Sequence, residues 1–298
     1  MATHQTAKTQ YVSSETTKFA YRRFGASEGV PLLFLIHFRG TMDKWDPLLI
    51  NSVAKIRPVI LVDYSGIGQS SGRVATSFRD SGVDIITFLS LIGVSKVDIL
   101  GFSIGAFVGQ MVALNADPNT LQVRKLIIAG SSASVGPDMP ETKNDYQTAA
   151  TAGTLEVDGF KTLFFPRNKE GEQAADSWWA RVAERNESAS GEKPSEWASQ
   201  DLTDGGAAMQ AQGTAYGAFM NAEASKGADG TYDRLSELKM PVLIAQGNDD
   251  YMFPTLNSFL FQQKVPNGHL IVYPNSGHGF LYQYAEEFAA HVNAFLDL

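Results

Sequence analysis

The stretch Gly101-Phe102-Ser103-Ile104-Gly105 decides the fold prediction, because of what lies on either side of it. It follows the short apolar run 97–100 and precedes the helix-like run 106–114. A Gly-x-Ser-x-Gly between a strand and a helix is typical of a nucleophile elbow, a strained turn that lifts the serine hydroxyl off the sheet edge. The glycines leave room for the bend, and the helix directs unpaired N–H groups at the serine. Ser103 is therefore a candidate nucleophile; the alternative is a glycine-rich turn whose serine caps the helix.

Similar apolar runs recur along the chain and alternate with helical patterns. The runs are continuous, which is typical of strands buried on both faces of a parallel sheet. This order predicts an α/β fold, with an antiparallel pair formed by residues 12 and 18–24 at the sheet edge. The predicted parallel strands are 32–36, 59–62, 97–100, 126–129, 242–245 and 270–273. The predicted helices are 47–56, 77–92, 104–116, 255–264 and 283–295.

The interval 132–240 breaks this alternation, because it contains helical patches but no buried-strand run. It also holds three of the four tryptophans. An insertion of this length is more typical of a folded lid than of a loop. We predict an α/β core formed by residues 1–131 and 241–298 and a helical cap over 132–240, the alternative being a second domain with its own core. Trp178 and Trp179 are then candidate substrate contacts.

A serine hydroxyl needs a neighbouring base, and that base needs an orienting carboxylate. Of the five histidines, His278 follows the last predicted strand and has a glycine on each side, which indicates a loop in a special conformation. Asp249 and Asp250 follow the penultimate strand, at the same edge as Ser103. One of the two is expected to hold His278 and the other to cap a helix or bind loop amides. The chain order serine, aspartate, histidine is the one expected for an α/β-hydrolase arrangement.

The loop 35–41 follows an early strand at the same edge and is a candidate oxyanion hole. We expect the backbone N–H groups of Phe38 and Ile104 to point at the developing oxyanion, each contributing about 3–4 kcal/mol to transition-state stabilisation. For His37, a hydrogen bond within its own loop is favoured over a catalytic role. Arg39 could contact the substrate or form a structural ion pair, and both interpretations stay open.

These residues together resemble the α/β-hydrolase superfamily, and the likeness covers nearly the whole chain. The turn Asp63-x-x-Gly66-x-Gly68-x-Ser70 is similar to the family's loop after strand four. The stretch Gly247-Asn248-Asp249-Asp250, followed by Pro254, is similar to its acid loop, and this resemblance selects Asp250 over Asp249.

The branch that the chain resembles most is that of the cofactor-free haloperoxidases and esterases, whose members are mostly serine hydrolases. The resemblance implies a lid between strands six and seven, where 132–240 lies, and it requires no metal or organic cofactor. One departure is His37-Phe38, where the family often has His-Gly, and this departure affects the expected oxyanion geometry. A serine at position 103, rather than an aspartate, argues against aspartyl-ester chemistry.

Composition limits the possible partners. The 298 residues carry a formal charge of −8, with a pI near 5.2, which argues against nucleic acid or an anionic membrane as the main partner. There is no cysteine, so thiol catalysis and Cys-ligated zinc are excluded. The polar start of the sequence shows no signal peptide and no apolar run approaches about 20 residues, so we expect a cytoplasmic protein. The run 63–72 lacks the glycine spacing of a dinucleotide fingerprint.

The sequence therefore predicts a serine hydrolase that cleaves a small hydrophobic ester or lactone through an acyl-enzyme. Other reactions on the same three residues stay open, namely carbon–carbon hydrolysis, or a lyase or cyclase step of secondary metabolism. A slow-turnover ligand receptor and a structural protein with an inactive site are further alternatives, and the fold alone does not rank them.

Overall fold

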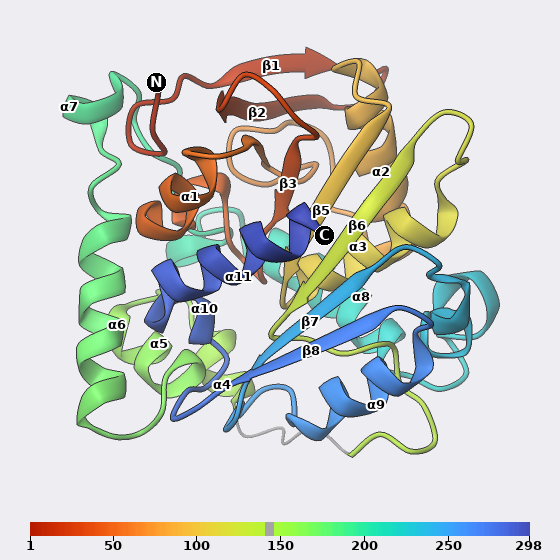
Figure 1. Ribbon diagram of the computed structural model, residues 1–298. Coiled ribbons are helices and arrows are strands. Elements are labelled where there is room, and N and C mark those ends of the chain that lie inside the picture. Colours follow the sequence, from red (N-terminus) through yellow and green to blue (C-terminus); the bar gives the residue numbers. More distant parts are fainter. Residues whose placement is uncertain (141–145) are drawn as a thin grey trace.

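The computed structural model describes residues 1–140 and 146–298. At its centre lies an eight-stranded sheet with the order β1-β2-β4-β3-β5-β6-β7-β8 (Figure 1). β1 and β2 pair antiparallel, β2 also pairs antiparallel with β4, and the other pairings are parallel. The predicted edge pair and the predicted parallel strands are confirmed. The strands are β1 (Gln10–Ser13), β2 (Lys18–Gly25), β3 (Leu32–Leu35), β4 (Pro58–Val62), β5 (Lys96–Phe102), β6 (Gln122–Ala129), β7 (Val242–Gly247) and β8 (Gly268–Tyr273).

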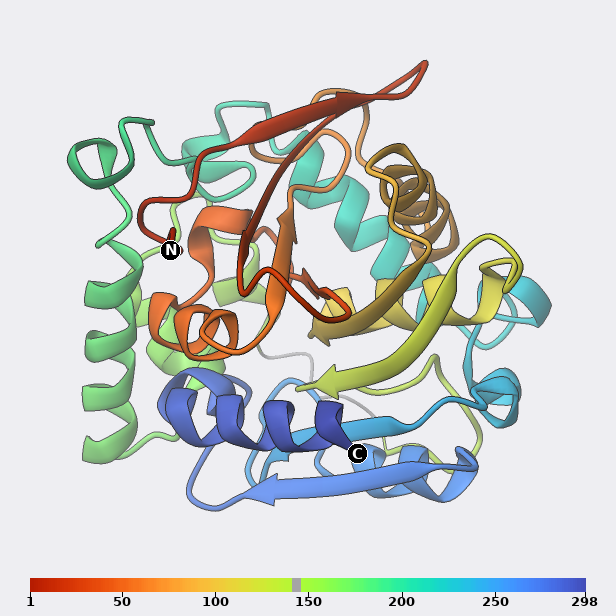
Figure 2. The same cartoon turned by 45° about the horizontal axis from the view of Figure 1, so that its top comes forward.

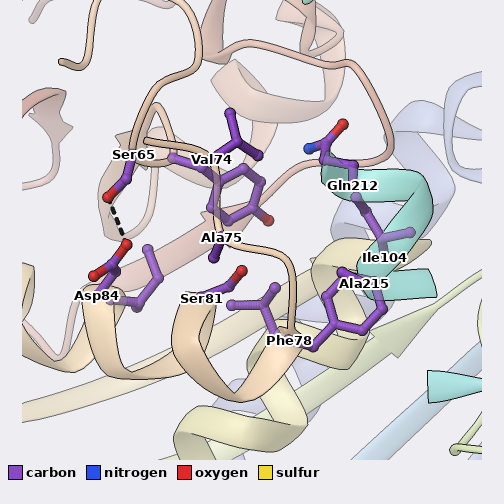
Figure 3. A pocket seen from close by; sticks show the side chains of 12 residues that line it. Ser65, Val74, Ala75, Phe78, Ser81, Asp84, Ile104, Gln212 and Ala215 are labelled. Carbon is purple, nitrogen blue, oxygen red and sulfur yellow. Dashed lines mark hydrogen bonds between the residues drawn. The ribbon is translucent and has the colours of Figure 1, made fainter. Parts of the chain in front are cut away.

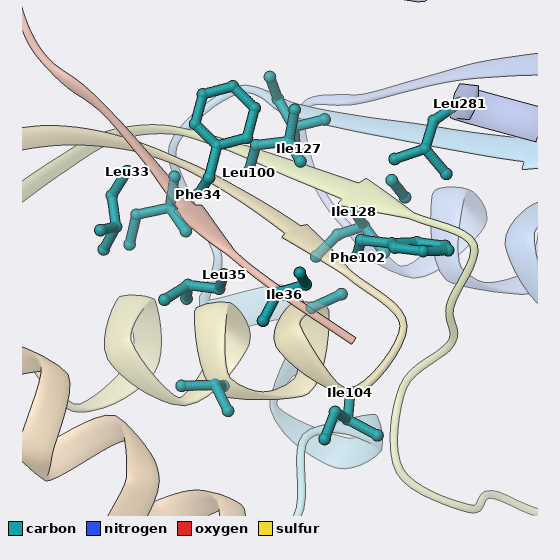
Figure 4. Packing of buried hydrophobic residues seen from close by; sticks show 14 of the residues in the cluster. Leu33, Phe34, Leu35, Ile36, Leu100, Phe102, Ile104, Ile127, Ile128 and Leu281 are labelled. Atoms are coloured by element: carbon teal, nitrogen blue, oxygen red, sulfur yellow. The ribbon is translucent and has the colours of Figure 1, made fainter. Parts of the chain in front are cut away.

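The central strands are buried because their side chains are apolar on both faces. All residues of β3 and β4 are buried. Figure 4 shows Leu33 and Phe34 of β3 beside Leu100 of β5 and Ile127 of β6 in one continuous core. Burying a side chain of this kind contributes about 1.5–3 kcal/mol, so the sheet is a rigid base for the loops at its carboxyl edge.

Helices cover both faces of the sheet. α1 and α11 pack together on one face, whereas α2 and α3 lie on the other (Figures 1 and 2). Asp46 begins α1 by accepting a hydrogen bond from the Leu48 N–H at 2.9 Å, as an N-cap does. Within the described ranges, no helix is both long and apolar enough to cross a bilayer. The α-helices are α1 (Pro47–Ala54), α2 (Phe78–Leu91), α3 (Ile104–Asn115), α4 (Gln147–Ala150), α5 (Val157–Phe164), α6 (Lys169–Val182), α7 (Glu187–Ser190), α8 (Ala207–Phe219), α9 (Leu256–Lys264), α10 (Phe280–Gln283) and α11 (Ala285–Asp297). The 3₁₀ helices are η1 (Met42–Lys44), η2 (Gln200–Leu202), η3 (Gly227–Asp229) and η4 (Tyr232–Glu237).

Residues 132–240, called the helical segment below, connect β6 to β7. Their described part contains α4 to α8 and no strand. The aromatic side chains of this segment pack onto the sheet and α10: the Trp178 ring stacks on Tyr282 with centroids 4.9 Å apart, and Phe164 lies 5.6 Å from Phe102. These rings belong to the same hydrophobic cluster as the strands. The helical segment and the strands therefore share one hydrophobic cluster, and the division into a core and a cap stays a prediction.

A buried ionic cluster joins the helical segment to the rest of the molecule. Asp43 of η1 lies 2.6 Å from both the Arg22 guanidinium of β2 and the Arg185 guanidinium. Arg185 also pairs with Glu192 at 3.0 Å. Burial raises the pKa of Asp43, but the two arginines outweigh it and hold that pKa below its usual value. We call Arg22, Asp43, Arg185 and Glu192 the ionic clamp.

The N-terminal residues are part of the same connection. Arg185 Nη1 donates to the carbonyl oxygens of His4, Gln5 and Ala7, at 2.9, 3.2 and 3.0 Å. The His4 side chain is buried, and its Nε2 donates to the Met42 carbonyl at 3.1 Å. One arginine of the helical segment therefore fixes the start of the described chain against the core.

Candidate active site

Ser103 sits at the turn between β5 and α3, in a backbone conformation that few residues adopt. Its φ and ψ are 58° and −124°, and its N–H donates to the Ala129 carbonyl at 3.0 Å. A Cβ added at Gly105 would overlap the Leu35 carbonyl, and one added at Gly101 would overlap the backbone of Ala106. Both glycines are therefore required for the close approach of the chain, and the strained turn predicted from the pentapeptide is present.

The predicted base and acid form a direct hydrogen bond. His278 Nδ1 lies 2.8 Å from Asp250 Oδ2, and both side chains are buried. Because a carboxylate can only accept, Nδ1 carries the proton in the neutral ring and Nε2 holds the free lone pair. Asp249 is exposed, and the bond of its N–H to the Ser276 carbonyl involves only the backbone. The geometry thus selects Asp250, in agreement with the resemblance.

Asp250 is held by three further donors. Its Oδ1 accepts the N–H groups of Met252 and Phe253 at 2.8 and 2.9 Å, and its Oδ2 accepts Gln246 Nε2 at 2.8 Å. Gln246 also donates to the Phe253 carbonyl at 3.0 Å. Sequence reasoning missed Gln246, although a buried polar residue near the end of β7, four positions before the acid, was an available signal.

Phe102, the residue before the nucleophile, contacts the predicted base. The Phe102 ring, directly before Ser103, lies 4.9 Å from the His278 ring, and a Cβ on Gly130 would contact His278. Among the described residues, His278 Nε2 is buried and has no hydrogen-bond partner. Catalytic hydrogen bonds in free enzymes are often long and tighten only when substrate binds. The arrangement therefore leaves a buried basic nitrogen beside the elbow.

The glycines around His278 act differently from the prediction. Neither Gly277 nor Gly279 has a positive φ. Instead, a Cβ on either residue would press against Phe164 of α5, and the Gly279 N–H donates to the Phe164 carbonyl at 2.6 Å. The glycines allow the histidine loop to pack tightly against the helical segment.

The two predicted oxyanion donors flank the nucleophile. Phe38 and Ile104 both line the cavity that contains Ser103. In the described part of the chain, neither N–H donates to another protein group. Ile104 is the first residue of α3, where an unpaired N–H is expected. Both amides are therefore free to donate a hydrogen bond to a substrate oxygen.

His37 keeps its hydrogen bond inside its own loop, as favoured above. Its Nδ1 donates to the Phe38 carbonyl at 2.9 Å. Burial lowers the pKa of His37 to about 3; the bond to Phe38 opposes this change, and nearby His278 adds to it. His37 is therefore neutral at ordinary pH and supports the shape of the loop.

Within the described residues Arg39 forms no ion pair with a carboxylate, and it lines the smaller of two cavities beside Ser103, so its contact with substrate stays a prediction. Its φ is 61°, and its buried guanidinium donates to carbonyl oxygens of the helical segment. Burial lowers the pKa of Arg39, and the charge of Asp204 opposes this shift. All five N–H donors of the fork are used by backbone carbonyls, so the guanidinium fastens the loop to the segment. The acceptors are Ala198 (2.8 Å), Ala150 (3.3 Å), Ala152 (2.6 Å), Gly153 (3.2 Å) and Ser199 (3.0 Å).

Two cavities adjoin Ser103, one of about 180 Å³ and one of about 20 Å³. As far as the described residues define these linings, neither includes Trp178 or Trp179, so the structure corrects the predicted substrate contacts. Trp178 is fully buried against Tyr282, and Trp179 stacks on Trp197 with centroids 6.1 Å apart. Trp178 attaches the helical segment to α10, because burying its large apolar surface stabilises that contact, whereas the ring contacts of Trp179 lie within the segment.

A third hollow, of about 20 Å³, lies between α2, α3 and α8. Figure 3 shows it lined by Phe78, Ile104 and Gln212, with Ser65 Oγ donating to Asp84 Oδ2 at 2.6 Å. This serine and carboxylate form a pair without a hydrogen-bonded imidazole in the described residues. The pair lacks the base that a serine nucleophile needs.

Comparison with known proteins identifies the family of the chain. The chain matches the family described as alpha/beta hydrolase fold over residues 31–283. The chain belongs to this family. An alpha/beta hydrolase fold protein from Chitinophaga pinensis is 30% identical, with 99% of each chain covered and a TM-score of 0.83.

More distant α/β-hydrolase structures share the fold at lower identity. An enzyme that degrades N-acyl homoserine lactones is 21% identical over 96% of this chain and 100% of the other, with a TM-score of 0.69. An esterase from Rhodococcus sp. ECU1013 is 18% identical over 98% of each chain, with a TM-score of 0.72. At this level of identity the likeness concerns the fold.

One curated relative matches a shorter stretch. The dihydrolipoyllysine-residue acetyltransferase component of an acetoin cleaving system from Cupriavidus necator is 30% identical over 125 residues, which are 40% of this chain. The chain spans about a third (32%) of the length of this relative.

Proposed function

We propose that the chain is a serine hydrolase that cleaves a hydrophobic carboxylic ester or lactone through an acyl-enzyme. The observation that carries the proposal is the buried bond from His278 to Asp250, which leaves the other ring nitrogen basic beside a strained serine. Such a nitrogen can take the hydroxyl proton as the serine attacks. Membership of the α/β-hydrolase family supports a hydrolase, and we place the chain in the haloperoxidase and esterase branch as part of the proposal.

In the proposed reaction, Ser103 Oγ forms a bond to the carbonyl carbon while His278 Nε2 takes its proton. The amides of Phe38 and Ile104 hold the oxyanion. The bond from the carbonyl carbon to the alcohol oxygen breaks, and that oxygen receives the proton from His278. Water then attacks the acyl-enzyme with the same base, releasing the acid and restoring Ser103. Asp250 keeps its charge and stabilises the imidazolium.

The helical segment acts as the cap in this proposal. Tyr146 and Tyr216 of this segment line the larger cavity beside Ser103, which supports a role in covering the substrate. Most of the other lining residues are apolar, among them Ile104, Met252 and Phe253, which supports a hydrophobic substrate. A small molecule is the only partner that the proposal needs, and it requires neither a metal nor an organic cofactor.

A fluorophosphonate probe tests the proposal directly. We expect intact mass to show one adduct and peptide mapping to place it on Ser103. In the Ser103→Ala variant the adduct disappears, and turnover of chromogenic esters falls by several orders of magnitude while the fold is kept. Ser65→Ala is the matched control, because it removes a serine that is paired with a carboxylate but has no imidazole. Undiminished ester cleavage by Ser103→Ala would refute the assignment.

A further inference from the structure

The two cavities that meet at Ser103 differ ninefold in volume. Both are lined by Phe38, Ser103 and Met252, so both adjoin the position that the reacting carbonyl would occupy. The larger cavity has about 180 Å³ and the smaller about 20 Å³. An ester carries an acyl group on one side of its carboxyl unit and an alcohol group on the other. Two cavities of unequal volume therefore favour an ester whose two groups differ in size.

The surface of the larger cavity is mainly apolar. Ile104 and Phe253 contribute apolar surface, and the hydroxyls of Tyr146 and Tyr216 lie 3.1 Å apart, where they hydrogen-bond to each other. A dry cavity of about 150 Å³ is enough to bind benzene. A cavity of about 180 Å³ therefore fits a group of the size of a phenyl or benzyl ring.

The smaller cavity is lined partly by rings and has little volume. His37, Phe160 and Phe164 line it, and their rings contact one another: Phe160 and Phe164 have centroids 5.0 Å apart, and His37 and Phe164 5.1 Å. A single water needs about 10–15 Å³ of this kind of space. About 20 Å³ therefore accepts a group no larger than a methyl.

We propose that the substrate is an ester with one ring-sized apolar arm and one arm of about methyl size, and that residue 213 limits the length of the larger arm. This inference rests on the proposed function and specifies its substrate class. It excludes esters that carry bulky groups on both sides, because the smaller cavity has no room for a second ring.

The size of the residue at position 213 of α8 controls the space for the larger arm, and the glycine found there leaves that space open. It is an exposed member of the lining, so it lies where the cavity opens. A Cβ added there would meet nothing within 4 Å, and its φ is ordinary for a helix. A longer side chain at this position would therefore enter the opening without strain elsewhere. Glycine within a helix costs about 1 kcal/mol relative to alanine, so the local structure does not favour it.

Isomeric esters test the size asymmetry at constant composition. Methyl phenylacetate and benzyl acetate carry the same atoms but place the ring on opposite sides of the carboxyl group, and benzyl phenylacetate carries a ring on both. We expect kcat/KM for one isomer to exceed that for the other by at least about tenfold, with benzyl phenylacetate as slow as the disfavoured isomer. The preferred isomer identifies which arm occupies the larger cavity. Comparable kcat/KM for all three esters would overturn the proposal.

A leucine at position 213 tests the limit, with Gly217→Leu as the matched control. Gly217 lies one turn further along α8, also has open space around its Cβ, and is outside the lining in the described residues. Both variants gain the same helix propensity. We expect Gly213→Leu to lower the ratio of kcat/KM for the preferred isomer over methyl acetate at least about tenfold, and Gly217→Leu to keep the wild-type ratio. Equal ratios in both variants would overturn the role of residue 213.

Fluorophosphonate labelling of the same preparations distinguishes failure of the cavity inference from failure of the proposed function. If Ser103 is labelled while the esters show no size preference, the cavity inference is wrong and the hydrolase proposal stands. If Ser103 is not labelled and no ester is cleaved, the proposed function itself is wrong, and the inference falls with it.

Discussion

Single residues outside the predicted triad hold its acid in place. Asp250 uses both carboxylate oxygens, and one of them accepts from His278 and from Gln246 at the same distance of 2.8 Å. A hydrogen bond to a charged group contributes about 1.5–3 kcal/mol. Gln246 therefore restricts the position of the carboxylate that orients the imidazole, although it lies outside the lining of the cavity in the described residues.

Gln246→Met should lower kcat by about ten- to a hundredfold with little change in KM, because one charge-assisted hydrogen bond to Asp250 is lost while the cavity lining is kept. Steady-state kinetics on a chromogenic ester gives both constants. Thermal unfolding of the same variant serves as the control for folding. A kcat within twofold of the wild type would contradict the positioning role.

The buried side chain of His4 predicts how the free energy of unfolding changes at acidic pH. Burial, followed by the charge of Arg22, lowers the pKa of His4 to about 4 from its usual 6.5. Below pH 6.5 the unfolded chain takes up a proton at His4 that the folded chain does not. The stabilising contribution of neutral His4 is therefore fully present above pH 6.5 and is lost progressively as the pH falls toward 4.

His4→Gln should flatten this dependence, because glutamine can still donate to the Met42 carbonyl but does not titrate. The free energy of unfolding, measured with urea between pH 4.5 and 7, should fall less steeply in the variant, by about one proton or 1.4 kcal/mol per pH unit. All other groups titrate in both proteins and cancel in the difference. Parallel curves would show that His4 is protonated in the folded state.

At the scale of elements, the elbow depends on how closely β3 and α3 approach each other. The backbone of Gly105 lies against the carbonyls of Leu35 and Ile36, where no side chain fits. This contact sets the distance between the start of α3 and the predicted oxyanion loop.

Gly105→Ala should destabilise the protein by about 3 kcal/mol, at the upper end of overpacking effects, because its methyl group would overlap the Leu35 carbonyl. Gly217→Ala, the same change at an open helical position, should instead stabilise by about 0.5–1 kcal/mol. Denaturant titration measures both. Similar values for the two variants would mean that β3 moves freely to admit the methyl group.

The same scale explains what the sequence could predict. The strands, Ser103, Asp250 and His278 were predictable because each follows from local patterns, and parallel strands bring their carboxyl ends to one edge. Arg39 and Trp178 were not, because their roles depend on how the helical segment packs, and that segment carries weak periodicity. Aromatic composition indicated burial there but not which surface each ring covers.

At the scale of the whole molecule, the ionic clamp connects elements that are far apart in sequence. Asp43 is the one carboxylate of the clamp that contacts both Arg22 and Arg185. Removing one partner of a buried ionic pair is costly, because the remaining charge is left without compensation.

Asp43→Asn should therefore destabilise the protein by about 3–5 kcal/mol. Hydrogen exchange should rise together in residues 4–9 and 184–192, because both segments are bonded to Arg185. Glu223→Gln, which breaks an exposed pair with Lys226, is the control and should leave both measurements unchanged. Faster exchange in only one of the two segments would show that the clamp does not couple them.

The position of Arg39 has one more consequence for the proposed reaction. Arg39 directly follows Phe38, and its guanidinium is fastened to backbone carbonyls on two stretches of the helical segment. A substrate that is too large and pushed this segment outward would displace Arg39, and with it the neighbouring Phe38 N–H that is proposed to hold the oxyanion. A molecule that is too large would then bind but react slowly, because the oxyanion amide would be displaced. In the proposed reaction, selectivity against such molecules would appear in kcat rather than in KM.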